Sequence, residues 1–377
     1  MGANLVCSRC VMDTTDTSIT FDTGGVCDHC RTFDAHTLPN WPKGAQAETL
    51  LRDSVDAIKD AGRGADFDCI IGMSGGIDSS YLTYLAKEKL GLRPLIFHVD
   101  AGWNTDVAVN NIEALVDGLD LELFTEVIDW QEMKDLQLAF IKSGVPHIDT
   151  PQDHAFFATM YKFALEHKVK YILTGGNLST ECVRNPIDWM YYQSDSTQLL
   201  DIHKSFGQRR LEKFPVTSIL WHKVFLPYIK RIKTLRPLDL MDYQKEEAAT
   251  FLKNAFGWQP YPQKHFESRF TRFYEGYWLP KKFGFDTRKV QLSSLILTDQ
   301  ITRAEAIEIL KQSPYSESDA RNDFEFVANK LQISVDELRF YFEQPNRTYK
   351  HYKNQAWLYN FGARILKGLG REVGGKR

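Results

Sequence analysis

The stretch Asp68–Ser80 reads DCIIGMSGGIDSS, and this stretch decides the fold. Its first half is a short apolar run that predicts a buried strand over Asp68–Met73, and its second half opens a helix predicted over Ser79–Leu90. The glycines between them let the backbone approach an anion. The free N–H groups at the helix start, together with the helix dipole, stabilise negative charge there. We therefore expect a phosphate-binding loop.

Side chains of this loop add to its backbone donors. Its serines supply hydroxyl groups, and Asp78 offers a carboxylate that could hold a Mg²⁺ ion bridging two phosphates. The loop lacks the Gly-Lys-Ser/Thr of a Walker A motif and the spacing of a G-x-G-x-x-G motif. An ordinary glycine-rich turn is the alternative interpretation. The residues expected to contact phosphate are Ser74, Gly75, Gly76, Asp78, Ser79 and Ser80.

Strand and helix patterns alternate after this loop. Apolar runs predict strands over Pro94–Asp100, Leu121–Val127 and Lys170–Thr174. Helical spacing is found over Asp106–Leu119 and Thr150–His167. Short apolar strands that alternate with helices are typical of an α/β fold with a parallel sheet covered on both faces. Ligands bind such sheets at the carboxyl ends of the strands.

The composition changes along the chain and predicts four parts. A cysteine-rich unit is followed by a linker with a helix over Thr49–Ala61, then by the α/β domain and a mostly helical region that begins with a helix over Asp242–Phe256. The basic, glycine-rich tail from Gly368 is expected to be disordered. The predicted bounds are residues 1–36, 37–66, 67–240 and 241–377.

Two CxxC pairs lie in the first unit, at Cys7, Cys10, Cys27 and Cys30. This spacing is typical of structural zinc sites, because tetrahedral zinc needs four soft ligands that converge from two turns. The unit has too few apolar residues to fold alone, so a metal would supply the missing stability. Free or disulfide-bonded cysteines are the alternative, and the spacing does not distinguish zinc from iron.

The overall charge limits the classes of function. The formal net charge is -3, which argues against a strongly basic nucleic-acid surface. No apolar run approaches the roughly 18 residues of a membrane span. No signal peptide is apparent, so we expect a cytoplasmic protein.

The loop sequence SGGIDSS, Ser74–Ser80, matches the PP-loop of the ATP pyrophosphatases, which have an adenine nucleotide alpha hydrolase-like fold. This superfamily includes GMP synthetase, asparagine synthetase and tRNA-lysidine and thiolation enzymes. The resemblance implies that ATP is split between its α and β phosphates and that AMP passes to a substrate oxygen. It also implies further ATP contacts, near adenosine and near the α-phosphate, from His98, Val99, Asp100, Thr174, Gly175, Gly176 and Asn177.

A second resemblance covers nearly the whole chain. It is to the N-acetyl sugar amidotransferases of bacterial surface-polysaccharide synthesis, the WbpG/PseA type. It is carried by CSRCVMDTTD, GVCDHC, GMSGGIDSSYL, FHVDAGWN, LTGGNLSTE and GWQPYPQKHFESRFTRFYEGYWLPKKFGFDTRKVQLSSLILTDQITRAEA. Such enzymes are thought to convert an N-acetyl group of a nucleotide sugar into an acetamidino group, in lipopolysaccharide O-antigen or nonulosonic acid synthesis.

The family resemblance also implies a reaction and partners. ATP would adenylate the amide oxygen, ammonia would attack the activated carbon, and AMP would leave. The ammonia would come from glutaminase and cyclase-like subunits that resemble those of imidazole glycerol phosphate synthase. The sequence agrees with this dependence, because no nucleophilic cysteine directly follows Met1 and no Cys-His-Glu glutaminase domain is appended.

Cations and N–H donors should line a site where negative charge develops on phosphates. The basic candidates are Lys230, Arg231, Lys264, His265 and Arg269, and we expect Asp78, Lys230 and Lys264 to be catalytic. Lys264, Glu267 and Ser268 have the spacing of one helix face, for which a surface ion-pair helix is the alternative interpretation. The candidate substrate contacts are Glu181, Arg184, His265, Glu267 and Arg269.

Two other functions are alternatives to the sugar amidotransferase. A tRNA-modifying enzyme that adenylates a base oxygen is disfavoured because the chain is not basic and the two remaining cysteines, Cys69 and Cys182, are isolated. Cys69 is expected in the core, and no base that could activate Cys182 is identifiable. A zinc-stapled binding module without chemistry is disfavoured by the complete loop and Asp78.

Overall fold

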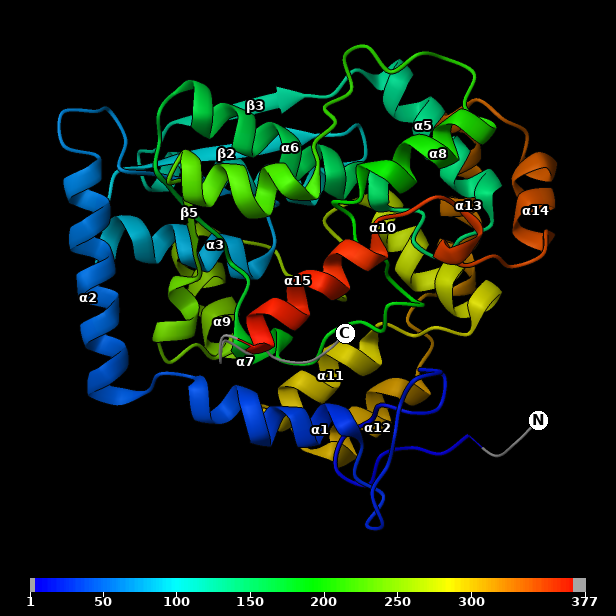
Figure 1. Cartoon of the computed structure of the whole chain (residues 1–377), viewed down its shortest axis with the longest axis horizontal. Coiled ribbons are helices and arrows are strands. Elements are labelled where there is room, and N and C mark those ends of the chain that lie inside the picture. The colour runs from blue at the N-terminus through cyan, green and yellow to red at the C-terminus, as the bar shows by residue number, and fades with distance from the viewer. Residues whose placement is uncertain (1–3, 369–377) are drawn as a thin grey trace.

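A five-stranded, entirely parallel sheet lies at the centre of the chain, in the order β3-β2-β1-β4-β5. This computed structural model describes residues 4–368 (Figure 1). The expected disorder of the tail therefore falls almost entirely on residues outside those described. The strands are β1 (Cys69–Gly72), β2 (Pro94–Asp100), β3 (Leu123–Val127), β4 (Tyr171–Leu173) and β5 (Lys233–Leu235).

Helices cover both faces of the sheet, as parallel strands without a polar face require. On one face, α3, α4 and α9 pack their apolar side chains against β1, β2 and β4, with α2 at the edge. On the other face, α6 and η4 pack against the same strands. These helices are α2 (Gly44–Ala61), α3 (Ile77–Tyr84), α4 (Asp106–Gly118), α6 (Thr150–Glu166), η4 (Trp221–Ile229) and α9 (Lys245–Phe256). The predicted α/β fold class is confirmed.

A second core, formed mainly by helices, lies beside the sheet. Helices of the C-terminal region pack in it against α5 and α8, which come from the middle of the chain. The buried aromatic residues Phe270, Phe273 and Trp278 are at its centre. Its helices are α5 (Trp130–Ser143), α8 (Ser196–Phe206), α10 (Arg269–Phe273), η6 (Tyr274–Phe283), α13 (Glu317–Leu331) and α14 (Val335–Glu343).

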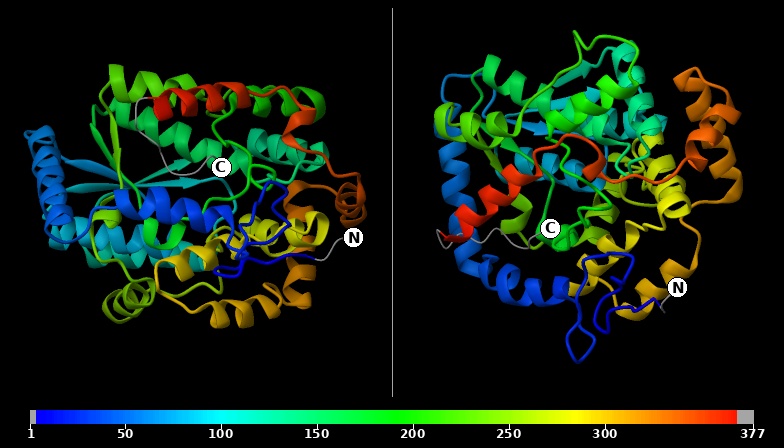
Figure 2. Two further views of the ribbon diagram at one scale, coloured as in Figure 1. Left: turned by 60° about the horizontal axis from the view of Figure 1, so that its bottom comes forward. Right: turned by 45° about the vertical axis from the view of Figure 1, so that its right-hand side comes forward.

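The cysteine-rich unit packs on the C-terminal region and not on the sheet. Figures 1 and 2 show this N-terminal segment beside α11 and α12. Arg303 of α12 donates from its guanidinium to the carbonyls of Cys7 (2.8 Å) and Cys10 (3.0 Å). The remaining elements are α1 (Asp28–Thr32), η1 (Phe33–Thr37), η2 (Leu38–Asn40), η3 (Leu85–Lys89), α7 (Leu178–Glu181), η5 (Pro237–Leu240), α11 (Arg288–Leu297), α12 (Arg303–Lys311), η7 (Tyr349–His351) and α15 (Ala356–Gly368).

Two local predictions differ from the structure. The helix expected from Thr49 already begins at Gly44, where φ is +55°. Glycine adopts this angle without strain, so the helix can begin at Gly44, within the segment that we expected to be a linker. The prediction that Lys264, Glu267 and Ser268 share one helix face is wrong. Residues 264–267 form a turn in which His265 has φ +68°, and the helix α10 starts only at Arg269.

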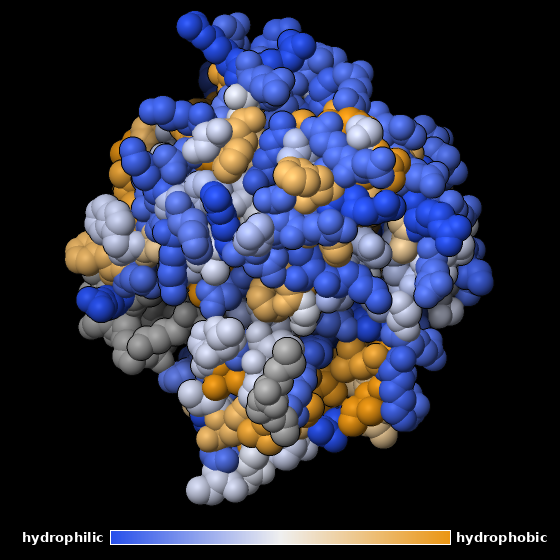
Figure 3. Space-filling model, turned by 90° about the vertical axis from the view of Figure 1, so that its right-hand side faces the viewer, coloured by the Kyte–Doolittle hydropathy of each residue, from blue (hydrophilic) through white to orange (hydrophobic). Residues whose placement is uncertain are grey.

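The face that carries α14 is mostly hydrophilic, with separate hydrophobic patches towards the lower edge of the view (Figure 3). No helix in the described part of the chain is both long and apolar enough to cross a membrane.

Candidate active site

A cavity of about 460 Å³ lies at the point where the strand order reverses between β1 and β4. In open α/β sheets, ligands bind at such a point, outside the carboxyl ends of the strands. One wall is the loop 74–80 that follows β1, and a second is the segment after β4. A third wall is the segment 258–267, which crosses from the C-terminal region. The volume is in the range of small-molecule sites.

The loop 74–80 has the close backbone packing that its glycines predict. Gly75 has φ +84°, and a Cβ there would lie 2.8 Å from the carbonyl oxygen of Ala108. A Cβ on Gly76 would lie 2.0 Å from Oε1 of Glu267. A larger residue at Gly75 would therefore displace the loop or α4, whereas one at Gly76 would displace the side chain of Glu267. Helix α3 begins directly after Gly76, so its free N–H groups face the cavity side where an anion is expected.

The segment 258–267 is hydrogen-bonded to the phosphate loop. The carbonyl of Gly75 accepts hydrogen bonds from Nε1 of Trp258 (3.1 Å) and from the hydroxyl of Tyr261 (3.2 Å). The side-chain amide of Asn111 in α4 donates to the carbonyl of Gln259 and accepts from the backbone N–H of Gln259. Sequence reasoning missed these aromatic anchors, although the stretch GWQPYPQ that contains them was recognised as distinctive.

Lys264 brings the walls of the cavity together. Its ammonium group donates to Oδ2 of Asp78 (2.8 Å), to Oε1 of Glu181 (2.6 Å) and to the hydroxyl of Thr180 (3.2 Å). Burial alone would lower the pKa of Lys264, but the two carboxylates raise it above its usual value. The side chain is therefore a fixed positive charge at the floor of the cavity.

Asp78 is the most highly hydrogen-bonded side chain of the loop. Its Oδ1 accepts from the hydroxyl of Tyr243 (2.6 Å) and from the amide of Asn177 (3.1 Å), while Oδ2 accepts from Lys264. Burial would raise the pKa of Asp78, but Lys264 and Tyr243 hold it below its usual value. Asp78 and Glu181 together offer carboxylate oxygens of the kind that Mg²⁺ prefers. Lys264 is the cation that binds both of them in this structure.

The segment after β4 also reaches the loop. Gly175 lies so close that a Cβ there would be 2.7 Å from the backbone of Asp78 and Ser79. Asn177 accepts from the N–H of Thr180 and thereby caps α7. Gly176 lines the cavity, and its carbonyl accepts from the guanidinium of Arg236 (2.9 Å). Of the predicted residues, Gly175, Gly176 and Asn177 are therefore brought to the phosphate loop or the cavity.

The residues at the end of β2 lie nearby but do not line the cavity. His98 is buried; its Nδ1 donates to the carbonyl of Met73 (2.8 Å), and its Nε2 accepts from Asn104 (2.9 Å). Asp100 accepts from the backbone N–H of Gly102 (2.7 Å). In this structure, His98 therefore binds the backbone of Met73, directly before the phosphate loop, and Asp100 binds the backbone of Gly102. The side chain of Val99 packs against the helical core and against the core under α6.

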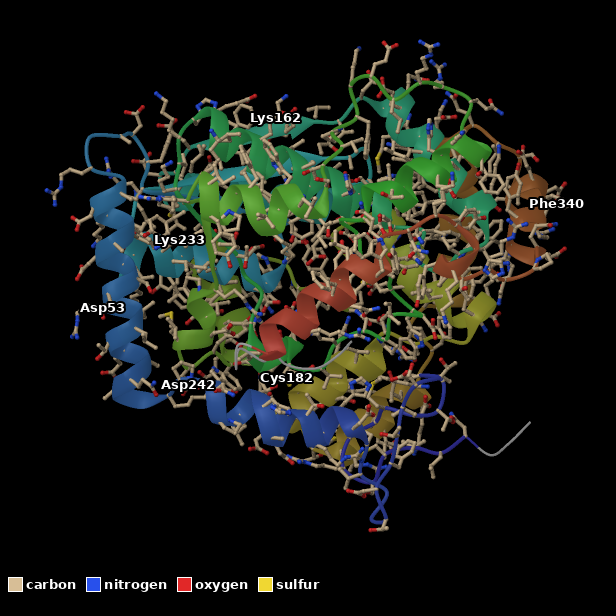
Figure 4. The ribbon with its side chains drawn as sticks, in the orientation of Figure 1. Asp53, Lys162, Cys182, Lys233, Asp242 and Phe340 are labelled. Carbon is tan, nitrogen blue, oxygen red and sulfur yellow. The ribbon has the colours of Figure 1, made fainter. Side chains whose placement is uncertain are left out.

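The predicted cations are only partly brought together. Lys230 and Arg231 precede β5, which begins at Lys233 (labelled in Figure 4), so they lie at the amino ends of the strands. The cavity lies at the carboxyl ends of the strands. The expectation that Lys230 lies in the site is therefore wrong. A basic run shows only where charge occurs along the chain, and the strand direction decides at which edge it lies.

The other candidate substrate residues divide between two places. His265 and Glu267 line the cavity. Arg269 lies outside it, where its Nε binds Asp323 at 2.7 Å and its guanidinium stacks on Phe326. Arg184 follows α7 and is exposed. The cavity also contains Lys245, which sequence reasoning did not select.

The surroundings of the two isolated cysteines do not activate their thiols as nucleophiles. Cys69 is buried in β1, where burial raises the pKa of its thiol. Cys182 follows α7 (Figure 4); its thiol donates to the carbonyl of Ser294, and burial raises its pKa to about 11. A thiol with a raised pKa is a poor nucleophile near neutral pH.

The four cysteines of the N-terminal unit converge, as predicted. All four are fully buried, and their sulfur atoms lie within 4.8 Å of one another. The separations are 3.8 Å for Cys7–Cys30, and 3.6 Å for both Cys10–Cys27 and Cys27–Cys30. Four sulfurs about 2.3 Å from one tetrahedral zinc ion would be roughly 3.8 Å apart. The cysteines therefore fit a single tetrahedral ion, and none of them is disulfide-bonded.

Comparison with known proteins identifies the C-terminal region. Residues 267–366 match the family model described as LPS biosynthesis protein WbpG-like, C-terminal domain. This region is therefore similar to the WbpG-like C-terminal domain, in agreement with the family resemblance expected from the sequence. No curated protein matches the chain.

Solved structures resemble the chain only loosely. They include NMN synthetase from Francisella tularensis, with 18% identity and a TM-score of 0.29 over 61% of this chain and 93% of that one. The NH3-dependent NAD synthetase from Campylobacter jejuni subsp. jejuni NCTC 11168, in complex with the nitrate ion, has 13% identity and a TM-score of 0.31 over 80% and 98%. The U34-tRNA thiolase NcsA from Methanococcus maripaludis, with its [4Fe-4S] cluster, has 13% and 0.33 over 86% and 88%. These values are too low to assign a ligand or a reaction.

Proposed function

We propose that this protein is an ATP-dependent amidotransferase that converts an N-acetyl group of a nucleotide sugar into an acetamidino group, releasing AMP and pyrophosphate. The observation that carries the proposal is the cavity in which the loop 74–80 and Lys264 meet. The WbpG-like C-terminal domain supplies one of its walls, through Glu267. We further propose that the product belongs to a bacterial surface polysaccharide, a lipopolysaccharide O-antigen or a nonulosonic acid, and that the enzyme acts in the cytoplasm.

The loop is suited to bind the pyrophosphate part of ATP. Backbone N–H groups at the start of α3 point to the cavity side, and Ser74 and Ser79 both line it. Binding there would hold the β and γ phosphates and leave the α-phosphate directed towards Gly175 and Gly176. A Mg²⁺ ion held by Asp78 or Glu181 would neutralise phosphate charge.

Two bonds form and two break in the proposed reaction. The amide oxygen of the acetyl group attacks the α-phosphorus, and the bond to pyrophosphate breaks. Ammonia then forms a bond to the activated carbon, and the carbon–oxygen bond breaks, so that AMP leaves with the former amide oxygen. Lys264 lines the cavity, so its positive charge would stabilise the negative charge that develops on phosphates bound there.

The cysteine centre would stabilise the fold without taking part in the reaction. A Zn²⁺ ion bound by Cys7, Cys10, Cys27 and Cys30 would have a complete ligand shell and no open position for a substrate. We propose zinc as the metal. The unit packs on α11 and α12, so its loss would disturb the C-terminal region.

Ammonia is proposed to come from a partner glutaminase, together with a cyclase-like subunit similar to that of imidazole glycerol phosphate synthase. Neither isolated cysteine is suited to act as a glutaminase nucleophile, since burial raises the pKa of both Cys69 and Cys182. The chain would accept free ammonium in the absence of this partner.

An isotope experiment tests the proposed reaction. A panel of N-acetylated nucleotide sugars, each labelled with ¹⁸O in the acetyl group, is incubated with the purified protein, MgATP and ammonium chloride. We expect sugar-dependent pyrophosphate release and ¹⁸O in AMP. We also expect a sugar product about one dalton lighter than the unlabelled substrate, because the amide oxygen is replaced by NH. AMP without ¹⁸O would contradict adenylation of the amide oxygen. Turnover only with tRNA would contradict the sugar substrate and favour base modification.

A further inference from the structure

Helix η4 exposes large apolar side chains on the side that points away from the sheet. The side that faces the sheet is buried, with Leu226 in the core under it. On the outer side, Leu220, Val224 and Tyr228 are 56%, 47% and 72% exposed, and Ile229 is also more than half exposed. The spacing of four residues places the first three on successive turns of one helix face. A surface helix normally carries polar residues on the face opposite to the core, so η4 departs from the usual pattern.

Helix α15 adds a second exposed apolar stripe. Tyr359 of this helix stacks on Tyr192, with ring centroids 3.6 Å apart. Trp357 and Phe361, again four residues apart, are each more than half exposed. The helices η4 and α15 both face the viewer in Figure 1, and both lie along the upper edge of the left view of Figure 2, so they belong to the same side of the molecule.

We call the exposed side chains of these two helices the outer apolar face. Its members are Leu220, Val224, Tyr228, Ile229, Trp357 and Phe361. Exposed apolar patches of this kind mark places where a protein binds another protein or a membrane.

The charge around this face has one sign. The stretch 213–238, which contains η4, has no aspartate or glutamate, and neither has α15. Four cations at and after η4 form no ion pair with a residue that the structure describes: Lys223, Lys230, Arg231 and Lys233. The Nζ of Lys170 donates to the carbonyl of Lys230 (3.1 Å) and so adds a fifth cation at the end of the helix. Lys230 and Arg231 lie away from the cavity, and the proposed reaction does not use their charge.

This composition fits an anionic membrane better than a protein partner. Lysine is depleted in protein–protein interfaces, whereas four of these five cations are lysines. Helices that lie in a membrane interface combine exposed leucine and aromatic side chains with lysine and arginine. Tyrosine and tryptophan are also favoured at the boundary between the headgroups and the acyl chains. Nucleic acid would match the charge but not the exposed aliphatic side chains.

We propose that the outer apolar face binds the surface of a membrane that contains anionic phospholipids. Leu220, Val224 and Ile229 would enter the boundary of the acyl chains, and Tyr228 and Trp357 would lie at the level of the headgroups. The cations at the end of η4 would contact the lipid phosphates. This inference goes beyond the proposed function and does not depend on it.

The first test is sedimentation of the whole protein with lipid vesicles. One set of vesicles contains phosphatidylcholine alone, and a second contains equal amounts of phosphatidylcholine and phosphatidylglycerol. We expect binding to the second set to be at least about tenfold tighter, because only anionic lipids attract the cations. Added salt should weaken this binding, since it screens the charges. Equal binding to both sets, or binding to neither, would overturn the proposal.

Two double variants assign the binding to this face. Leu220→Ser with Tyr228→Ser removes apolar contacts, and we expect binding to weaken about tenfold or more. Lys223→Gln with Lys233→Gln removes two charges; each cation near an anionic surface is worth about fivefold, so we expect about 20-fold weaker binding. All four side chains are exposed, so the fold should stay intact, which the Tm checks. Unchanged vesicle binding in both double variants would overturn the proposal.

A matched control changes the same kinds of side chain elsewhere. Phe340→Ser with Lys253→Gln replaces one exposed aromatic residue and one exposed lysine. Phe340 belongs to α14, at the far end of the molecule from Lys233 (Figure 4), and Lys253 belongs to α9, on the other face of the sheet from η4. This control should bind anionic vesicles as the unchanged protein does. Loss of binding in the control equal to that in the two double variants would overturn the assignment to η4 and α15.

Hydrogen–deuterium exchange locates the contact in the unchanged protein. We expect anionic vesicles to slow the exchange of η4 and α15 and to leave α9 and α14 as they are. Protection confined to other elements would overturn the proposal. A protein that binds no vesicles but forms a dimer, which Leu220→Ser with Tyr228→Ser dissociates, would also overturn it and would assign this face to a second copy of the chain.

The proposed function and this inference fail separately, because AMP formation from soluble nucleotide sugars is measured without vesicles. Sugar-dependent AMP formation by a protein that binds no anionic vesicles would leave the amidotransferase standing and overturn the membrane contact. Vesicle binding that both double variants weaken, in a protein that modifies no nucleotide sugar, would support the membrane contact and contradict the function.

Discussion

The cysteine centre and the phosphate-loop cavity are both convergent clusters, but one is closed and the other is open. The four cysteine sulfurs face only one another and are fully buried. Around the cavity, by contrast, Lys264, Asp78 and Glu181 pair with one another yet border a space large enough for a ligand. A complete shell can only stabilise, whereas an incomplete one can bind and react. The following predictions test this difference, from the largest expected effect to the smallest.

The largest effect is expected from opening the closed cluster. Cys10→Ser would remove one of four metal ligands, and structural zinc sites contribute on the order of 10 kcal/mol to folding in small domains. We expect loss of about one bound metal per chain, measured by elemental analysis, and a large fall in Tm. Cys69→Ser is the control, because Cys69 is buried in β1 outside the metal centre and should leave the metal content unchanged. Full metal content in Cys10→Ser would contradict the structural site.

Next in size is the loss of the cation at the open cluster. Lys264→Met would leave Asp78 and Glu181 without their shared partner, and breaking a buried ion pair costs about 3–5 kcal/mol. Glu181 is partly exposed, which places the expected stability loss at the lower end. We also expect kcat to fall about 100-fold or more, because a preorganised charge at the phosphates is lost.

Chemical denaturation and pyrophosphate release measure these two effects of Lys264→Met. Lys253→Met, at an exposed position near the end of α9, is the matched control and should change neither by more than a small amount. Normal turnover in Lys264→Met would show that the cation is structural and would make the open cluster resemble the closed one.

A smaller effect is expected from the backbone of the phosphate loop. Gly75→Ala would place a Cβ 2.8 Å from the carbonyl of Ala108 at a positive φ, which costs on the order of 1–3 kcal/mol. The loop should shift and weaken ATP binding, measured by calorimetry, more than it lowers the Tm. Gly284→Ala is the control, since its φ is also positive but no atom lies within 4 Å of a Cβ there. Equal ATP binding in both variants would contradict the close packing of the loop.

The smallest effect concerns pH. The pKa of His265 is raised to about 9 in the folded protein, chiefly through Glu275 acting against burial. A group with a raised folded pKa stabilises fully below its unfolded pKa of about 6.5 and loses this contribution as the pH rises towards 9. We therefore expect His265→Gln to reduce the loss of stability between pH 6.5 and 9, by a modest amount because the side chain is 44% exposed. Parallel pH profiles of the two proteins would contradict the pairing with Glu275.

The fold and both clusters could be anticipated where a short pattern carries the information. Apolar runs and helical spacing placed most of the strands and helices around the sheet, because burial acts on each segment through its own side chains. Segments such as α5, α8 and the short β5 were not predicted. The residues around Lys264 have helical spacing but form a turn, because this segment bends to bring Lys264 to Asp78 and Glu181.

The sequence by itself determined the phosphate loop and the cysteine centre. Each lies within a short segment or a pair of turns, where glycine conformation and CxxC spacing already define the geometry. Only the tertiary structure decided what surrounds them. It brings Lys264 and Tyr243 to Asp78 from far along the chain, and it places Lys230 at the amino ends of the strands, away from the cavity. Contacts of this kind depend on strand direction and helix packing, which no local pattern contains.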